Sequence, residues 1–174
     1  MKNKIQNFII LAFIFSLCSC SSDDSDSTSN VSAKGTWNLI SLSIETAFDF
    51  DNDGLAQKNL FDEVPCYSGN FVSFDSNGEA RLVTGLTYIS ADVNSNDPSD
   101  FEYIFACQDG FDAETTWTQS NNTVTLQLVG EDVLGTISGD ELTVILPDFF
   151  EIEMYDGMNF TNVQEDVTLI YIKM

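Results

Sequence analysis

The sequence contains no histidine, and only 3 prolines and 6 lysine or arginine residues stand among its 174 residues. Without histidine there is no Ser-His-Asp or Cys-His arrangement and no histidine general base. Zinc and copper sites are disfavoured as well, because those metals are usually held by histidine and cysteine. A pair of carboxylates could hydrolyse a glycoside, but with 28 acidic residues such pairs are expected by chance. We therefore predict that the protein is not an enzyme.

Basic side chains are scarcest in the part of the chain that follows Cys20. Only Lys34, Lys58, Arg81 and Lys173 remain there against all 28 acidic residues, so the formal charge of this part is −24. Nucleic acids and anionic lipid headgroups are recognised by clustered lysine and arginine. We therefore expect no nucleic-acid partner, whereas the acidic surface would attract cations or simply keep the protein in solution.

The N-terminal residues have the pattern of a secretory signal peptide. Two lysines among the first four residues precede an apolar run at residues 8–17, and small residues follow that run. As a helix the run would reach only about 15 Å, half of a roughly 30 Å hydrocarbon core, so it is too short to span a membrane. We expect residues 1–19 to be removed on export.

The sequence Leu-Cys-Ser-Cys at residues 17–20 resembles the lipobox of bacterial lipoproteins, in which an aliphatic and two small residues precede the modified cysteine. The resemblance implies that Cys20 carries lipid, and two or more acyl chains hold a protein firmly at a membrane. Residues 21–30 contain no apolar side chain to bury, so we predict a disordered tether over residues 20–33. Its acidic residues resemble an export signal to the outer face of the Gram-negative outer membrane. The alternative is a solvated spacer that carries no sorting signal.

Two cysteines remain once Cys18 leaves with the signal peptide and Cys20 carries lipid. These are Cys66 and Cys107. In an oxidising compartment, a lone pair of cysteines in one domain most often forms a disulfide. We predict this bond, and the alternative is a pair of buried free thiols.

From residue 34 onwards the sequence is typical of an all-β domain, with short alternating or aromatic-rich runs between turn signals. Asn77-Gly78 is a hairpin signal, and similar turn sequences lie at residues 119–122 and 138–140. The three prolines, Pro65, Pro98 and Pro147, fall between the runs. We expect about 8–10 strands, in an up-and-down antiparallel barrel or a meander sandwich. The clearest are residues 37–44, 70–75, 80–83, 115–118, 123–128, 133–137, 141–146 and 167–173.

A Gly-Thr-Trp sequence at residues 35–37, opening the first expected strand, is similar to the Gly-x-Trp start of lipocalins. An Asp-rich loop, the hairpin at residues 70–83, Trp117 before a turn and a closing strand follow in the same order. Together these features resemble the lipocalin-like domain of Gram-negative bacterial lipoproteins, over most of residues 34–174. The resemblance implies a small barrel on a lipid tether. The segment at residues 88–105, with a long polar stretch at residues 92–98, departs from the pattern.

An Asp-Phe-Asp-Asn-Asp-Gly sequence at residues 49–54 matches the first half of an EF-hand-type calcium loop, with oxygen ligands at alternate positions before a glycine. The twelfth position, normally a bidentate glutamate, is Leu60, and no helix pattern flanks the loop, so acids further on would have to complete the site. We predict a calcium site, and the alternative is a solvated acidic turn. The candidate ligands are Asp49, Asp51, Asp53, Asp62 and Glu63.

These features favour a lipid-anchored binding module at the outer membrane, exposed toward the cell exterior, for a small apolar or sugar-like ligand. The alternative is a structural or interaction lipoprotein that docks to another envelope protein, with calcium stiffening its loop. A carboxylate-based hydrolase is the third hypothesis. Phe149 and Phe150 lie beside acidic residues outside a clean strand pattern, and they would either rim an open barrel end or pack under a loop.

Overall fold

The structure is a computed structural model that describes residues 31–95, 101–155 and 158–174. It contains nine strands, one short α-helix and one 3-10 helix within those residues. The strands are β1 (Gly35–Phe48), β2 (Gln57–Asn59), β3 (Phe71–Phe74), β4 (Glu79–Val93), β5 (Phe101–Ser120), β6 (Thr123–Leu128), β7 (Glu131–Ser138), β8 (Glu141–Tyr155) and β9 (Phe160–Lys173). The helices are α1 (Leu60–Glu63) and η1 (Pro65–Tyr67).

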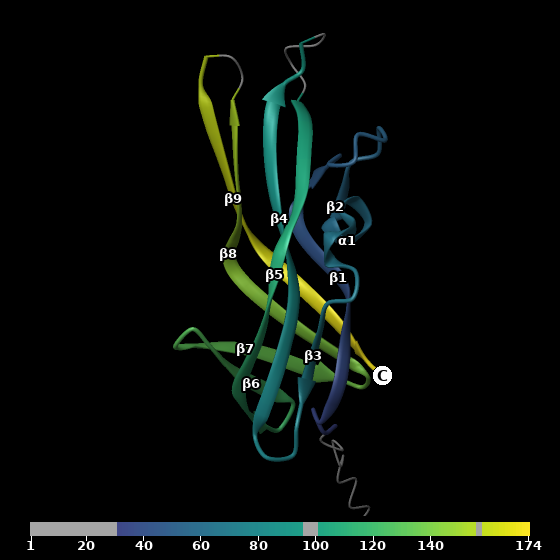
Figure 1. Cartoon of the computed structure of the whole chain (residues 1–174), viewed down its shortest axis with the longest axis vertical. Coiled ribbons are helices and arrows are strands. Elements are labelled where there is room, and N and C mark those ends of the chain that lie inside the picture. The colour runs from purple at the N-terminus through teal and green to yellow at the C-terminus, as the bar shows by residue number, and fades with distance from the viewer. Residues whose placement is uncertain (1–30, 96–100, 156–157) are drawn as a thin grey trace, which may run out of the picture.

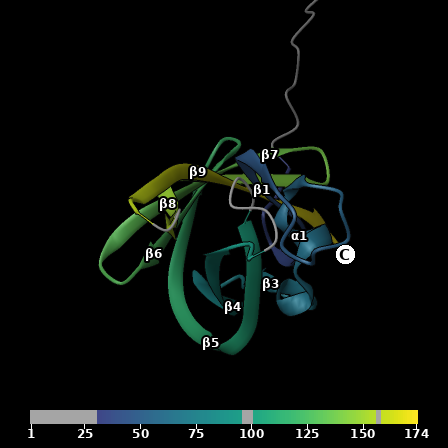
Figure 2. The same ribbon diagram turned by 90° about the horizontal axis from the view of Figure 1, so that it is seen from above.

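The strands form one sheet whose neighbour order, β2-β1-β3-β4-β5-β6-β7-β8-β9, follows the chain except that the short β2 lies outside β1. Because β1 also pairs with β9, the sheet closes into a barrel of eight antiparallel strands. Figure 2 shows the strands as a ring, viewed from the end that carries the long hairpins. The expected up-and-down barrel is therefore confirmed, and the chain does not form the alternative sandwich.

Two-residue turns join β5 to β6, β6 to β7 and β7 to β8. The first residue of these turns is Asn121, Val129 and Gly139, with φ angles of 55°, 52° and 62°. Asparagine and glycine adopt positive φ readily, which is why they are typical of tight hairpin turns. A β-branched residue rarely does so, so Val129 is the exception among the three.

Two hairpins, β4–β5 and β8–β9, are much longer than the barrel and extend side by side beyond one end of it (Figure 1). We call their outer parts the arms: residues 86–93 with 101–108, and residues 150–155 with 160–165. The arms touch through one parallel pairing, between Ala91 and Met154. The described residues of the 88–105 segment, which departed from the lipocalin-like pattern, form most of the first arm.

Irregularities in register mark where each arm leaves the barrel. One lies between Thr84 and Leu86 in the β4–β5 hairpin, and the other between Leu146 and Phe150 in β8–β9. Pro147 sits in the second irregularity, inside β8, so the expectation that it separates two strands is wrong. A bulge suits proline because an extra residue interrupts the ladder, and proline has no N–H to donate to it. Pro98 lies outside the described residues.

The barrel interior holds two apolar clusters. The lower core, at the end remote from the arms, includes both tryptophans, with Trp37 fully buried. The indole Nε1 of Trp37 donates to the Ala33 carbonyl oxygen at 2.6 Å, and that of Trp117 donates to the Asp75 carbonyl oxygen at 3.1 Å. The upper core, at the base of the arms, is made of Ile44, Phe48, Phe50, Leu60, Val64, Ala91, Phe150, Ile152 and Val167.

The packed part of the chain begins earlier than the sequence indicates. Ala33, assigned to the tether, is fully buried, and its N–H donates to Gln119 Oε1 at 2.9 Å. The Gln119 amide in turn donates to the Val31 carbonyl oxygen at 2.7 Å. The expected signal peptide at residues 1–19 and the expected lipidation site, Cys20, lie outside the described residues. Among the residues described, no helix has the length and apolar character needed to cross a membrane.

Candidate functional site

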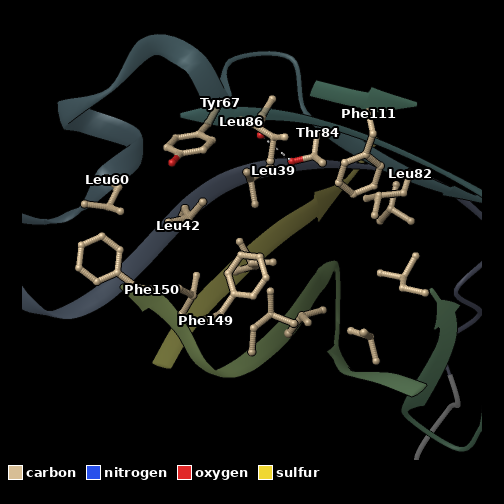
Figure 3. A pocket seen from close by; sticks show the side chains of 18 of the residues that line it. Leu39, Leu42, Leu60, Tyr67, Leu82, Thr84, Leu86, Phe111, Phe149 and Phe150 are labelled. Carbon is tan, nitrogen blue, oxygen red and sulfur yellow. Dashed lines mark hydrogen bonds between the residues drawn. The ribbon is translucent and has the colours of Figure 1, made fainter. Parts of the chain in front are cut away.

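A cavity of about 570 Å³ lies inside the barrel, between the lower and the upper core. Figure 3 shows side chains from β1, β4, β5, β8 and α1 pointing into this common space. Protein interiors contain few voids larger than a water molecule, whereas small-molecule pockets typically measure about 300–1,000 Å³. Every barrel strand contributes an apolar side chain, among them Leu39, Val72, Leu82, Phe111, Leu126, Val133, Leu142 and Tyr171.

The cavity opens where the barrel wall is thinnest, between β5 and β8. In the described chain β5 pairs with β6 only over Trp117–Ser120, and β7 pairs with β8 only over Gly135–Ser138. The short β6–β7 hairpin therefore covers only the lower part of this side. Four apolar lining residues are exposed there, and we call them the mouth. They are Leu86 (44%), Phe111 (43%), Val129 (105%) and Phe149 (68%).

Phe149 and Phe150 both line the cavity although they are consecutive in a strand. Successive strand residues normally point to opposite faces, and the irregularity between Leu146 and Phe150 removes that alternation. Asp148 lies in this irregularity. It has a φ of 51°, and its N–H donates to Asp166 Oδ1 at 2.9 Å. Phe150 packs in the upper core, whereas Phe149 stands exposed at the mouth, in the side wall and not at the end of the barrel.

The polar groups of the cavity are few and mostly uncharged. Tyr67, Thr84, Thr87 and Tyr171 contribute hydroxyls, Glu151 is the one acid, and no lysine or arginine lines the described cavity. Burial raises the pKa of the Tyr67 hydroxyl, and an interaction with Thr87 acts in the opposite direction. Thr87 Oγ1 is buried without a hydrogen-bond partner among the described residues, so its contact with Tyr67 falls short of a full hydrogen bond.

A disulfide joins Cys66 in η1 to Cys107 in β5, with an S–S distance of 1.99 Å and a Cα–Cα distance of 5.2 Å. The predicted pair is therefore bonded. Closing a loop of 41 residues stabilises the fold by about 4 kcal/mol in the chain-entropy estimate. The backbone of β4 at Gly85 packs directly against the backbone of Cys66, since a Cβ added to Gly85 would lie 2.2 Å from the Cys66 carbonyl oxygen. Only glycine fits at that position, which is one of the cavity-lining residues.

The structure brings three of the five predicted calcium ligands together. Carboxylate oxygens of Asp49, Asp51 and Glu63 all lie within 4.8 Å of one another, and we call these residues the acidic cluster. Asp53 and Asp62 lie outside it. Asp53 Oδ1 accepts a hydrogen bond from the Leu55 N–H at 2.8 Å, and Asp62 Oδ2 accepts one from Asn59 Nδ2 at 2.7 Å.

Glu63 is the unusual member of the cluster, because it is 2% exposed. Its Oε2 accepts from the N–H of Phe50 at 2.8 Å and of Asp51 at 3.4 Å. Its Oε1 is buried with no hydrogen-bond partner among the described residues. Burial raises the pKa of Glu63 against these two hydrogen bonds, and the charges of Asp51 and Asp49 raise it further.

No protein-family model, curated protein or solved structure matches the chain. The candidate sites therefore rest on the chain's own geometry. Sequence reasoning found the disulfide and the acidic residues, but it missed the cavity mouth. A signal for the mouth was present in residues 146–150, where proline and aspartate interrupt an otherwise apolar strand. That the protein is not an enzyme stays a prediction.

Proposed function

We propose that this chain is a lipid-anchored, extracytoplasmic, lipocalin-like module that captures a small, largely apolar ligand in its barrel. The cavity of about 570 Å³ carries the proposal. A folding domain gains by filling such a space with side chains, because dispersion contacts are lost around a void. An apolar cavity with an opening to solvent is instead the usual form of a small-molecule site.

The lining favours the apolar over the sugar-like ligand, and a neutral over an anionic one. A sugar needs several polar partners, whereas the described polar side chains are four that carry a hydroxyl and Glu151, among many apolar ones. An anionic ligand such as a fatty acid would find no basic side chain in this lining, and it would meet the Glu151 charge. We therefore expect an apolar body with one hydroxyl- or carbonyl-type group, placed near the Tyr67 and Thr87 hydroxyls.

The mouth supports ligand entry from the side of the barrel. Val129 keeps a positive φ although its side chain is fully exposed and gains no packing in the described structure. Strained residues that local packing does not explain cluster at functional sites. A valine, rather than the usual asparagine or glycine, would place an apolar group beside Phe111 and Phe149 on the path into the cavity.

The anchor and the acidic loop complete the proposal. The described chain enters the barrel at the lower core, through Val31 and Ala33, and the arms extend from the opposite end (Figure 1). Lipid on Cys20 would therefore hold the lower end near the outer membrane and leave the arms facing away. Calcium bound by the acidic loop at the base of the arms would stiffen that outer end.

Uptake of the neutral fluorescent probe N-phenyl-1-naphthylamine tests the cavity. We expect saturable fluorescence enhancement that dodecanol competes away and that dodecanoate competes away at least about tenfold less well. Leu128→Trp should abolish uptake by filling the space beneath the mouth. Leu134→Trp is the matched control, because Leu134 lies on the same hairpin but is exposed and does not line the cavity.

Two results would contradict the proposal. Equal uptake by the Leu128→Trp and Leu134→Trp variants would mean that the probe binds elsewhere, and no uptake by the wild-type protein would mean that the cavity does not accept ligands. The second result would favour the alternative, a structural or interaction lipoprotein. The observation behind that alternative is the aromatic surface of the arms, where the exposed Tyr155 and Phe160 rings lie 4.6 Å apart.

A further inference from the structure

The acidic cluster contains a feature that an ordinary solvated turn lacks, which is a buried carboxylate oxygen without a partner. Glu63 Oε1 has neither water access nor a hydrogen bond within the described structure. Leaving a buried charged or polar atom unsatisfied costs folding free energy. Native proteins retain such an atom mainly where an ion, a water molecule or a function satisfies it. Glu63 therefore points to a ligand.

The surroundings of Glu63 make that ligand a cation. Asp49 and Asp51 bring their carboxylates within 4.8 Å of that of Glu63, so three acids share one small volume. Like charges at this separation repel one another. Among the described residues no lysine or arginine forms an ion pair with these carboxylates, since the one ion pair there joins Arg81 to Asp112.

The separations allow the three carboxylates to reach one ion. Calcium is held by oxygen ligands at about 2.3–2.6 Å, so two oxygens bound to the same ion lie at most about 5 Å apart. All three oxygen pairs of the cluster fall within that limit. Calcium is the better match for carboxylates on a loop, because it accepts flexible geometry, whereas magnesium demands near-octahedral geometry and usually keeps several water molecules.

Backbone N–H groups hold all three carboxylates in place. Asp49 accepts from the N–H groups of Asp53 at 2.9 Å and Gly54 at 2.8 Å, and Asp51 Oδ1 accepts from the Asp53 N–H at 3.0 Å. Glu63 accepts from Phe50 and Asp51 as described above. These donors orient the carboxylates and leave other lone pairs free. A carboxylate oxygen can accept an N–H and still contact a metal ion.

We propose that Asp49, Asp51 and Glu63 form a divalent-cation site with a preference for calcium over magnesium. The site ties the loop after β1 to α1 through Glu63, and it differs from the EF-hand pattern of the sequence. Asp53, the third acid of that pattern, lies outside the cluster and is not among the three ligands. The remaining coordination positions would be filled by backbone carbonyl oxygens and water. This inference stands whether or not the barrel binds an apolar ligand.

Calorimetric titration of the purified protein with CaCl2, after removal of metal by a chelator, tests the site. We expect one saturable event with a Kd of order 10⁻⁴–10⁻³ M, the range of extracellular calcium modules, and weaker binding of MgCl2. Calcium should also raise the melting temperature, because it binds the folded state alone. Glu63→Gln keeps the shape of the side chain and should weaken calcium binding at least about tenfold.

Two matched controls separate this site from general attraction to an acidic surface. Asp62→Asn removes the same charge one residue away, and Asp53→Asn removes it within the loop. Both should keep calcium binding within about twofold of the wild-type value, since neither residue belongs to the cluster. A Glu63→Gln variant that binds as well as the wild type would overturn the proposal, and so would wild-type protein that binds no calcium at 10 mM.

Loss of binding in Glu63→Gln must not arise from misfolding. Removal of one repelling charge should leave the metal-free melting temperature equal to that of the wild type or above it. Binding lost together with a lowered metal-free melting temperature would instead assign Glu63 a structural role, as acceptor for the Phe50 N–H, and would contradict the proposal.

Discussion

The lower and upper cores of the barrel are held together in different ways. Around the lower core the strands pair on both sides, as β1 does when Trp37 faces Val72 of β3 and Lys173 of β9. Around the upper core β4 still pairs with β5 and β8 with β9, but the β1–β9 ladder has ended, and aromatic rings are packed by a loop and by α1. Phe50 stacks on Phe48 at 5.0 Å between ring centroids and meets Tyr103 edge-on at 5.1 Å.

Beyond the end of the β1–β9 ladder, individual side chains join the two strands in place of backbone hydrogen bonds. The β1–β9 ladder ends at Ser43 and Thr168, and beyond it the Glu165 carboxylate accepts from the N–H of Glu45 at 2.7 Å and of Thr46 at 2.8 Å. The disulfide and the acidic cluster lie in the same region. A continuous ladder makes a rigid frame, whereas such local links open separately. The cavity lies between the two regions, so we expect its lower end to be rigid and its upper end to open more easily.

The largest expected effect is that of Trp37→Ala, in the lower core. Trp37 is fully buried and its indole is hydrogen-bonded, so the substitution should cost about 3–5 kcal/mol of unfolding free energy. That is a large share of the roughly 5–15 kcal/mol stability of a typical domain. Urea denaturation followed through the remaining Trp117 fluorescence measures it.

Phe50→Ala is the matching change in the upper core, at a residue that is also fully buried. The cost of truncating a core residue depends on how far its surroundings relax. Because Phe50 lies on a loop beside the short α1, we expect a cost at least about 1 kcal/mol smaller than that of Trp37→Ala. Equal costs with one shared transition would show that both cores belong to a single rigid unit.

A second, smaller effect concerns Glu165. Burial acts to raise the pKa of Glu165, but the hydrogen bonds from Thr46 and Glu45 outweigh it and lower that pKa below its usual value. A carboxyl whose pKa is lower in the folded state stabilises the protein above the unfolded-state pKa, near 4.5, and loses this contribution as the pH falls through the folded-state pKa. Glu165→Gln should therefore cost about 1 kcal/mol at pH 7 and less at pH 3, because protonation removes the charge that these hydrogen bonds favour.

Urea denaturation at the two pH values measures the Glu165 effect, and hydrogen exchange of the Glu45 and Thr46 amides locates it. Glu131→Gln controls for the change in net charge, because Glu131 is exposed on the β6–β7 hairpin. A cost of Glu165→Gln that is the same at pH 7 and pH 3 would mean that its carboxylate does not join β1 to β9.

Much of the lower region could be predicted from the sequence, and little of the upper region could. The strand at residues 167–173 and the turns near Gly78 and Gly139 follow local rules of alternation and backbone conformation. The arms do not, because residues 88–93 and 160–165 mix polar and apolar side chains without a clear alternation, and their strands are defined by the partners with which they pair. The same limit applies to the acidic cluster, where only the fold shows that Glu63, and not Asp53, meets Asp49.

The smallest expected effect is a gain in stability at the mouth. In Val129→Asn the new residue suits the φ of 52°, so we expect a stabilisation of about 1 kcal/mol from relief of strain. The reciprocal change Asn121→Val, in the equivalent turn between β5 and β6, should cost a similar amount. Thermal melts measure both. If Val129→Asn also weakens uptake of the naphthylamine probe, the strain at this turn is retained for ligand entry. If it stabilises the protein and leaves uptake unchanged, the mouth does not depend on Val129, and Phe111 and Phe149 alone form its apolar rim.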